Sequence, residues 1–400
     1  MFVFFTHIIF YILFTYLFLT SLYFFVVAMA GRIKRGFEYG IYPEKKKIAL
    51  FIPSYKEDQI IIETAGRALE QSYAKDKYEV FVIADHLQQS TLERLRTLPV
   101  QLIEVDFDIS TKAKSLHEAL VLATPMEFDI AVILDADNIM SADCLEKINC
   151  AFARGYKAVQ CHRVAKNKNN AVAILDVASE EINNHLFRRG QRALGFSSSL
   201  IGSGMAFDFR VFQKIFNLPI ILENPGEDRE IDLQLMKEGI EVEFIEDAYV
   251  FDEKVSSAAV FENQRLRWLE AQFNNIRRFF DKDIRSHSGN PGYWYKLFQT
   301  LLLPRSLYLV AFFVIFCCLL AMQFSPIPFM APPVPWWYLA MALYASALLI
   351  SLPLSLYNWN LFKALISLPL LVLSMTRAIF RMKKNRKEFI HTPKVHTEKV

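Results

Sequence analysis

A long apolar run at the start of the chain limits its possible folds more than any other feature. Residues Phe2–Ala30 contain no Lys, Arg, Asp or Glu, and a helix of that length can cross a hydrocarbon core of about 30 Å. The run lacks the charged beginning of a signal peptide and exceeds its usual apolar length, so we predict an uncleaved transmembrane anchor over residues 1–31. Arg32, Lys34 and Arg35 follow directly, and this positive charge predicts a cytoplasmic location for the next domain.

A second apolar region lies near the other end of the chain and adds to an overall apolar fraction of 53%. Leu307–Met322 and Trp336–Leu356 are each long enough to span a bilayer. The second stretch begins with three aromatic residues, which are typical of the membrane–water interface. Together with the N-terminal anchor, these stretches predict a multi-pass protein of the cell (inner) membrane.

The last apolar stretch, Leu361–Phe380, is interrupted by Lys363, Pro369 and Arg377. If this stretch spanned the bilayer, the basic tail over residues 381–400 would lie outside, against the positive-inside bias. We therefore predict that it lies in the membrane interface with its cations toward the lipid headgroups. Residues 291–380 would then form interfacial and transmembrane helices, and the tail would be cytoplasmic.

Residues 46–280, between these apolar ends, alternate between short apolar runs and amphipathic stretches. Continuous apolar strands separated by helices are typical of a parallel sheet covered on both faces. Ligands of such sheets bind at the carboxyl ends of the strands, so we expect a site at that edge of an α/β domain. The predicted strands are Ile48–Pro53, Glu79–Ala84, Val100–Val105 and Ile130–Leu134, and helices are predicted over residues 58–71 and 112–123.

Carboxylates occur at the ends of these predicted strands. Asp135 and Asp137 follow the fourth strand, and two carboxylates at alternate positions of a strand end point the same way. Such a pair could hold Mg²⁺ or Mn²⁺ and neutralise a leaving diphosphate. An acidic turn that merely ends a strand is the plain alternative. The context favours the metal site, because Asp85 closes the neighbouring strand, where it could accept a hydrogen bond from a nucleobase.

Two further helices carry polar candidates. Glu227 and Asp228 open one helix, where a carboxylate could only stabilise the helix start or could act as general base beside an acceptor hydroxyl. Gln264 and Trp268 lie one turn apart on the other helix, with Arg267 adjacent. These three side chains suit a sugar acceptor or a diphosphate, although an amphipathic helix facing lipid headgroups is the alternative.

These motifs resemble, in their order, those of the membrane-bound processive branch of the family 2 inverting glycosyltransferases, which includes the cellulose, chitin and hyaluronan synthases. The resemblance runs from about Lys46 to Lys394. Three positions depart from the family pattern: Lys56 replaces the usual Asn, Gly226 replaces Thr, and His391 replaces Val. The matching segments are Pro53-Ser-Tyr-Lys-Glu57, Asp85, Asp135-Ala-Asp137, Gly202-Ser-Gly-Met-Ala-Phe207, Glu227-Asp228, Gln264-Arg-Leu-Arg-Trp268 and Phe389-Ile-His-Thr-Pro-Lys394.

The resemblance implies a GT-A-type nucleotide-sugar-binding domain with flanking transmembrane and interfacial helices. For a phosphate contact it favours Lys114 over Lys112, although a solvated helix face explains either lysine equally well. It implies nucleotide contacts from Tyr55, Glu57 and Asp85, and metal binding by Asp135 and Asp137, with Asp135 also near substrate. It implies a base at Asp228 beside Glu227, and acceptor or diphosphate contacts from Gln264, Arg267 and Trp268. It also implies a gating segment that contains Thr392 and Lys394.

The predicted activity is that of a hexosyl- or N-acetylhexosaminyl-transferase. It would move a sugar, with inversion, from a UDP-sugar or similar donor to a glycan acceptor, in polysaccharide biosynthesis at the cytoplasmic membrane face. The alternatives are transfer of a single sugar to a lipid carrier and a non-catalytic scaffold for glycan export. The acidic motifs argue against the scaffold, because unneeded buried carboxylates cost stability. Basic clusters flank the apolar runs, which predicts contacts with membrane lipids and no nucleic-acid partner.

Overall fold

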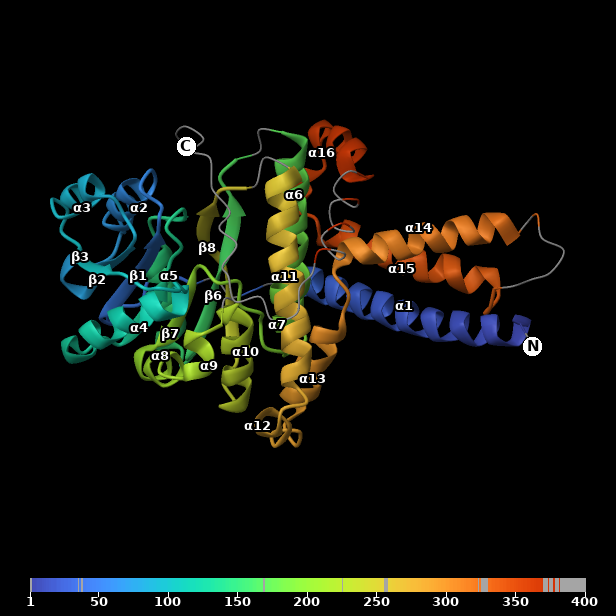
Figure 1. Ribbon diagram of the computed structural model, residues 1–400, viewed down its shortest axis with the longest axis horizontal. Coiled ribbons are helices and arrows are strands. Elements are labelled where there is room, and N and C mark those ends of the chain that lie inside the picture. The colour runs from blue at the N-terminus through green and yellow to red at the C-terminus, as the bar shows by residue number, and fades with distance from the viewer. Residues whose placement is uncertain are drawn as a thin grey trace.

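The protein forms an α/β domain with a group of long apolar helices beside it (Figure 1). The computed structural model describes residues 2–34, 36, 39–167, 170–224, 226–254, 258–322, 324, 330–369, 373, 377 and 381. The side chains of residues 2, 3, 258–261, 263, 265 and 267 lie outside this description.

An eight-stranded sheet in the order β3-β2-β1-β4-β7-β6-β8-β5 forms the centre of the domain. The first four strands along the chain pair in parallel, as their continuous apolar runs predict. Strand β7 runs antiparallel to both β4 and β6, so the sheet as a whole is mixed. The strands are β1 (Ile48–Tyr55), β2 (Tyr78–Asp85), β3 (Gln101–Val105), β4 (Ile130–Ile133), β5 (Ile139–Met140), β6 (Ala158–Ala165), β7 (Met205–Asp208) and β8 (Val242–Asp252).

Helices cover both faces of the sheet because successive side chains of a strand point to opposite faces. Ile48, Leu50 and Ile52 of β1 pack with α2 (Ile61–Ala68), α3 (Gln89–Leu95) and α5 (Cys144–Ala153). Ala49 and Phe51 pack on the other face with α4 (Lys112–Ala123), α8 (Phe209–Phe216), α9 (Pro219–Leu222) and α10 (Glu227–Lys237). Helix α4 has the predicted bounds, whereas the helix predicted over residues 58–71 is shorter at both ends.

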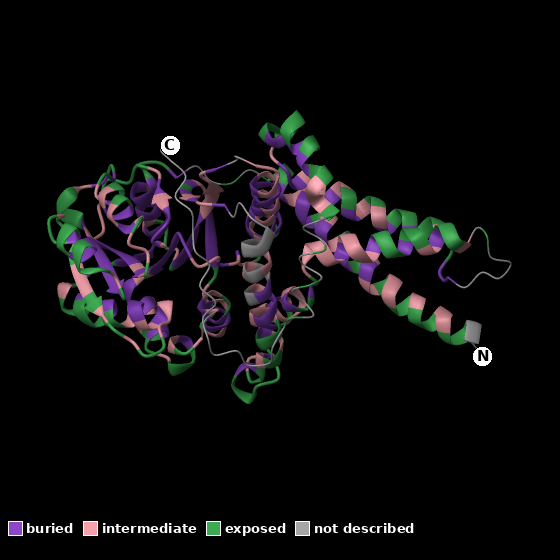
Figure 2. Ribbon diagram, turned by 45° about the horizontal axis from the view of Figure 1, so that its top comes forward, coloured by how far each residue is buried: buried purple, intermediate pink, exposed green. Residues whose placement is uncertain are grey.

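Three helices of the described part of the chain are long and apolar enough to cross a membrane. They are α1 (Phe2–Ile33), α14 (Arg305–Met322) and α15 (Val334–Ser351), and they extend together away from the sheet (Figure 1). Phe24, Tyr308 and Trp337 pack between them. Exposed residues lie along their outer sides (Figure 2), as expected for a surface that faces lipid.

A layer of helices joins the sheet to these apolar helices (Figure 1). On this layer His185 Nε2 lies 2.9 Å from the carbonyl oxygen of Ala28 in α1. A Cβ atom on Gly190 would lie 2.4 Å from the Val27 oxygen, so only glycine permits this close approach. The layer consists of α6 (Ala171–Asn184), the π-helical turn η3 (His185–Arg189), α7 (Gly190–Ala193), α11 (Ala258–Arg278), α12 (Lys282–Arg285) and α13 (Pro291–Leu301).

The predicted interfacial stretch begins in a short helix, α16 (Trp359–Ala364), which packs against α6. Trp359, Phe362 and Ile366 are 65%, 61% and 80% exposed, and apolar side chains with this exposure suit a membrane interface. Most of the stretch beyond residue 369 lies outside the described residues, so its interfacial placement stays a prediction.

Candidate active site

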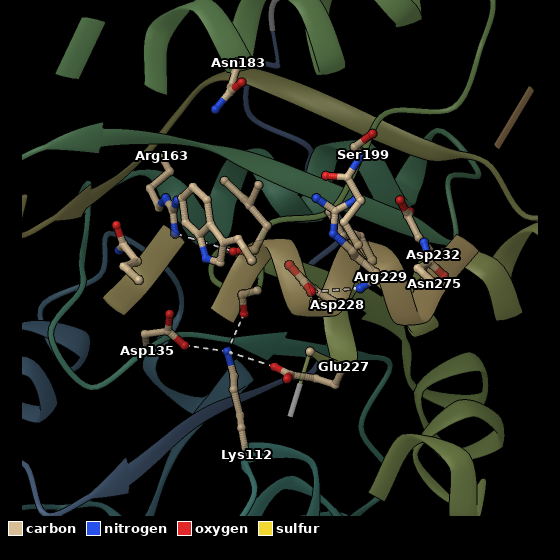
Figure 3. Close-up of a pocket in the computed structure, with 18 of the residues that line it drawn as sticks. Lys112, Asp135, Arg163, Asn183, Ser199, Glu227, Asp228, Arg229, Asp232 and Asn275 are labelled. Carbon is tan, nitrogen blue, oxygen red and sulfur yellow. Dashed lines mark hydrogen bonds and ion pairs between the residues drawn. The ribbon is translucent and has the colours of Figure 1, made fainter. Parts of the chain in front are cut away.

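A cavity of about 570 Å³ lies between the carboxyl edge of the sheet and the connecting helices (Figure 3). Its walls come from strand ends, from helix starts and from the segment that leads into α14. Most of the residues singled out from the sequence line this one cavity, although they come from five separate parts of the chain. They are Tyr55, Glu57, Asp85, Asp135, Asp137, Glu227, Asp228, Gln264 and Trp268.

The ends of β1 and β2 form one end of the cavity, where Tyr55 and Asp85 are register partners. Asp85 is 1% exposed, and its Oδ1 lies 2.5 Å from His86 Nδ1. Its other oxygen, Oδ2, has no hydrogen-bond partner among the described residues. A buried carboxylate oxygen without a donor is costly, so this oxygen is well suited to accept a hydrogen bond from a ligand.

The backbone of the residue after β1 explains why the family pattern has Asn at this position. Lys56 has a φ of +56°, in the left-handed region where Asn is tolerated better than Lys. The backbone N–H of Lys56 donates to the Asp85 oxygen at 3.1 Å, which ties the two strand ends together. An Asn at this position would relieve backbone strain without changing the turn.

Asp135 and Asp137 lie in the turn after β4, which ends at Ile133. The sequence analysis placed the pair directly after a strand ending at Leu134, and the observed strand ends one residue earlier. The pair faces the cavity through the geometry of the turn, and the Asp135 N–H donates to Ser203 Oγ at 3.0 Å. The segment around Gly202 and Gly204, both with positive φ, therefore packs directly against the Asp-x-Asp turn.

Lys112 lies between Asp135 and Glu227 in this cavity (Figure 3). Its ammonium pairs with Asp135 Oδ1, lies 3.9 Å from Glu227 Oε1 and donates to the Gly202 oxygen at 2.5 Å. Burial lowers the pKa of Lys112, but the carboxylates of Asp135 and Glu227 outweigh burial and raise it. The lysine therefore remains charged and neutralises part of the acidic cluster.

The other candidate lysine, Lys114, is not among the residues that line this cavity. Its ammonium donates to the Ile109 oxygen at 2.8 Å and lies 5.9 Å from the centre of the Phe107 ring. Two positions apart on an α-helix are separated by about 200°, so only one of the two lysines can face the site. The place predicted for Lys114 is occupied by Lys112.

Helix α10 begins at Glu227, as predicted, and brings two carboxylates to the cavity. Burial raises the pKa of Glu227 to about 7, an effect that Lys112 opposes and Asp228 reinforces. Asp228 is only half-buried, and its Oδ1 accepts a hydrogen bond from the Arg229 N–H at 2.8 Å. The two neighbouring carboxylates therefore lie in different environments, one largely desolvated and one accessible from the cavity.

A second departure from the family pattern, Gly226, has a steric explanation. Its φ of −120° does not require glycine. A Cβ atom at this position would lie 3.0 Å from the Cβ of Ala271 in α11, a contact that the helix would have to shift to accommodate. The glycine lets α11 approach the start of α10 closely.

Helix α11 contributes Gln264 and Trp268 to the cavity wall. The Gln264 Oε1 atom is buried and has no hydrogen-bond partner among the described residues, as expected of a group that meets a polar ligand. The side chain of Arg267 lies outside the described residues, as do Thr392 and Lys394 of the predicted gating segment.

The cavity also contains charged residues that the sequence reasoning missed. Arg163 Nη2 lies 3.0 Å from Glu180 Oε2, and Arg163 Nε lies 3.6 Å from Asp252 Oδ2. The Lys296 ammonium lies 2.9 Å from Asp232 Oδ2. Asp232 could have been found, because it follows Asp228 by one helical turn, but no local pattern marks Arg163 or Lys296.

The donor atoms at the sheet edge fit a metal that arrives with a phosphate ligand. Among the described residues, no group of three or more His, Cys, Asp and Glu side chains could hold a metal ion. Mg²⁺ beside phosphate usually takes one or two protein carboxylates and completes its shell with water and phosphate oxygens. Asp135 and Asp137 match that smaller set.

Comparison with known proteins is consistent with this geometry. A family model described as "Glycosyltransferase like family 2" matches residues 43–271, which is more than half of the chain. No curated protein matches the sequence. The solved structure of the mannosyltransferase PcManGT from Pyrobaculum calidifontis, in complex with GDP-Man and Mn²⁺, aligns with a TM-score of 0.56 and 18% identity over 90% of this chain and 97% of that chain. This likeness shows a shared fold.

A weaker likeness connects the chain to TarS from S. aureus. The alignment has a TM-score of 0.38 and 16% identity, and it covers 56% of this chain and 39% of that chain. A similarity of this size does not establish a common fold over the whole chain.

Proposed function

We propose that this chain, which belongs to the glycosyltransferase-like family 2, transfers a sugar from a nucleotide-diphosphate sugar to an acceptor held at the cytoplasmic face of the cell membrane. One observation carries the proposal. A single cavity contains the carboxylates at the sheet edge, the start of α10, and residues 302–306, which precede and begin the membrane-spanning candidate α14. Donor, base and membrane-borne acceptor could therefore meet in this one cavity.

The donor would bind at the sheet edge. Asp85 would accept from the nucleobase through its unpartnered oxygen, with Tyr55 and Glu57 beside it. Because Glu57, Asp85, Asp135 and Asp137 all line this end, a diphosphate needs added positive charge there. Asp135 and Asp137 would hold Mg²⁺ or Mn²⁺, which when bound supplies that charge to the leaving diphosphate. The Mn²⁺ and GDP-Man bound to PcManGT support this assignment.

The base would be Asp228. Among the described residues Asp228 accepts one hydrogen bond, at Oδ1, which leaves Oδ2 available to take a proton from the acceptor. Attack from the face opposite the diphosphate would invert the anomeric centre. Glu227, held beside Lys112, would shape the field around this carboxylate, and Gln264, Arg267 and Trp268 would contact the acceptor or the departing diphosphate.

The acceptor would be a growing glycan, as the resemblance to processive synthases implies. A lipid carrier is a second candidate, and one observation favours it. Leu302, Leu303 and Pro304 line the cavity directly before α14, so an apolar chain could enter from the bilayer at this point.

The test is to incubate the full-length protein in lipid nanodiscs with radiolabelled UDP- and GDP-sugars and a membrane lipid extract. A water-soluble polymer would support glycan synthesis, and a product that partitions into organic solvent would support a lipid acceptor. Asp228→Asn serves as the inactive control, and Asp281→Asn, an exposed change outside the cavity, as the matched active control. If wild-type protein consumes no donor under any condition, the proposed function is wrong.

A further inference from the structure

The cavity contains a buried cation that the donor and base chemistry does not use. Arg188 of the π-helical turn η3 lines the cavity and is 3% exposed. Its Nε donates to the Ser199 oxygen at 3.2 Å, and its Nη1 donates to Asn184 Oδ1 at 3.0 Å. Within the described part of the chain, Arg188 has no carboxylate at ion-pair distance, and its Nη2 donates to no residue. A buried charge without a counter-charge is costly unless a ligand supplies one.

Arg163, in the same cavity, shows how a structural arginine is accommodated. Its guanidinium pairs with Glu180 and Asp252, and although burial lowers its pKa, these carboxylates outweigh burial and raise it. For Arg188 the balance is reversed. Burial lowers its pKa to about 10, and the more distant Glu180 offsets burial only in part. The positive charge of Arg188 is thus the less compensated of the two.

The position of Arg188 connects the base with the membrane helices. Ser179, Asn183 and Phe187 follow one another at helical spacing and form one wall of the cavity. Arg188 lies at the end of this wall. At the other end of this wall Arg305, the first residue of α14, donates to the Ser179 oxygen at 2.6 Å and to Ser179 Oγ at 2.8 Å. A rise of 1.5 Å per residue places Arg188 about 14 Å along this wall from Ser179.

The cavity therefore has polar groups for the head of an amphipathic acceptor and apolar groups for its tail. Ser199, whose carbonyl accepts from Arg188, lines the cavity that also contains Asp228 (Figure 3). Phe187, Leu302 and Leu303 provide apolar surface in the same cavity.

We propose that Arg188 binds a phosphate group on the acceptor, and that this acceptor is a membrane lipid carrying a phosphate monoester. The inference rests on the proposed function and selects the second of its two candidate acceptors, the lipid carrier. A guanidinium binds phosphate oxygens through paired hydrogen bonds, which would use the open Nη2. The apolar tail would leave past Leu302 and Leu303 toward α14.

The transfer is balanced without a further reactant. An oxygen of the lipid phosphate forms a bond to the anomeric carbon of the donor sugar. The bond from that carbon to the oxygen of the β-phosphate breaks, and the nucleoside diphosphate leaves with the electron pair. The phosphate dianion, the main form near pH 7, attacks without releasing a proton, and the proton of the monoanion would pass to Asp228.

The experiment compares two acceptors that differ only in the phosphate, farnesyl phosphate and farnesol. It uses full-length protein in nanodiscs and the nucleotide sugar that wild-type protein consumes in the assay described under the proposed function. Wild-type protein should glycosylate farnesyl phosphate and leave farnesol unmodified. Arg188→Gln should raise the KM for farnesyl phosphate about 30-fold or more while the donor KM changes less than about threefold. Arg188→Lys, which retains the charge but not the paired geometry, should lie between them.

Two controls separate this role from a structural one. Arg277→Gln removes an exposed cation of α11 that does not line the cavity, and it should leave both KM values unchanged. Slow hydrolysis of the donor without any acceptor reports whether the Arg188 variants still fold and bind donor. An unchanged hydrolysis rate together with a raised acceptor KM supports the proposal.

Three outcomes overturn it. Equal transfer to farnesol and farnesyl phosphate would show that the phosphate is not recognised. A rise in the donor KM instead of the acceptor KM would assign Arg188 to the donor diphosphate. Inhibition by inorganic phosphate at the concentration at which farnesyl phosphate saturates would show a site for free phosphate. Failure of wild-type protein to use any donor would instead refute the proposed function, so the two failures are distinguishable.

Discussion

Replacing Glu227 with Gln tests how the acidic half of the cavity is stabilised. Burial raises the pKa of Glu227 from 4.5 to about 7, with Lys112 acting in the opposite direction. Between about pH 4.5 and 7, Glu227 is therefore mostly protonated in the folded protein and mostly ionised in the unfolded chain. Gln has nearly the shape of the protonated side chain and cannot ionise.

The sign and size of the effect follow from these two pKa values. Because the folded pKa is the higher one, the stability contributed by the protonated carboxyl is fully present below about pH 4.5 and is lost as the pH rises through about 7. One pKa unit corresponds to about 1.4 kcal/mol, so the free energy of unfolding should fall by about 3 kcal/mol across this window. For a chain of 400 residues the matching decrease in Tm is about 4 °C, and Glu227→Gln should lack it.

The assay is thermal unfolding of full-length protein in detergent with chelator and without nucleotide, between about pH 4.5 and 8.5. Lys112→Gln removes the ammonium that holds the Glu227 pKa down, so in this variant the loss should continue to higher pH. Glu223→Gln changes an exposed carboxylate next to α10 and should follow the wild-type profile. If wild type and Glu227→Gln lose stability equally with rising pH, Glu227 does not titrate near 7 and the reasoning is refuted.

Four further predictions concern the site and its topology. Asp137→Asn should abolish transfer, and EDTA should silence the wild type until Mg²⁺ or Mn²⁺ is restored; full activity in chelator would contradict the metal assignment. Asp228→Asn should lower turnover by about 10²-fold or more with nucleotide-sugar binding retained, whereas equal losses of binding and turnover would make Asp228 a positioning residue. A Val395→Cys variant should react with an impermeant thiol reagent in inside-out vesicles and resist it in intact cells. The reverse labelling would mean that Leu361–Phe380 spans the membrane and that the gating analogy fails. Lys56→Asn should raise the free energy of unfolding by about 0.5–1 kcal/mol, measured by thermal or denaturant unfolding, because Asn tolerates the left-handed backbone better; no gain would mean that the turn is unstrained.

Local patterns in the sequence were sufficient for the elements that build the site. Continuous apolar runs predicted β1, β2 and β4 because these strands are buried on both faces of the sheet, whereas the edge strand β3 is only partly buried. Helical periodicity and the acidic start predicted α10 from Glu227. The apolar runs that predicted α1, α14 and α15 needed no tertiary information, since length and the absence of charge are properties of the segment itself.

The tertiary structure decided which charged groups share the cavity. Lys112 and Lys114 have the same local sequence character, and only the docking of α4 against the Asp135 turn directs the first into the site. The pairing of Arg163 with Asp252 joins residues 89 positions apart. The antiparallel strand β7 pairs with β4 and with β6, which also lie far from it in the sequence. Arg188 carries no motif at all. Its proposed role rests on burial without a carboxylate at ion-pair distance among the described residues. Such burial depends on how distant segments pack, and no periodicity along the chain encodes that packing.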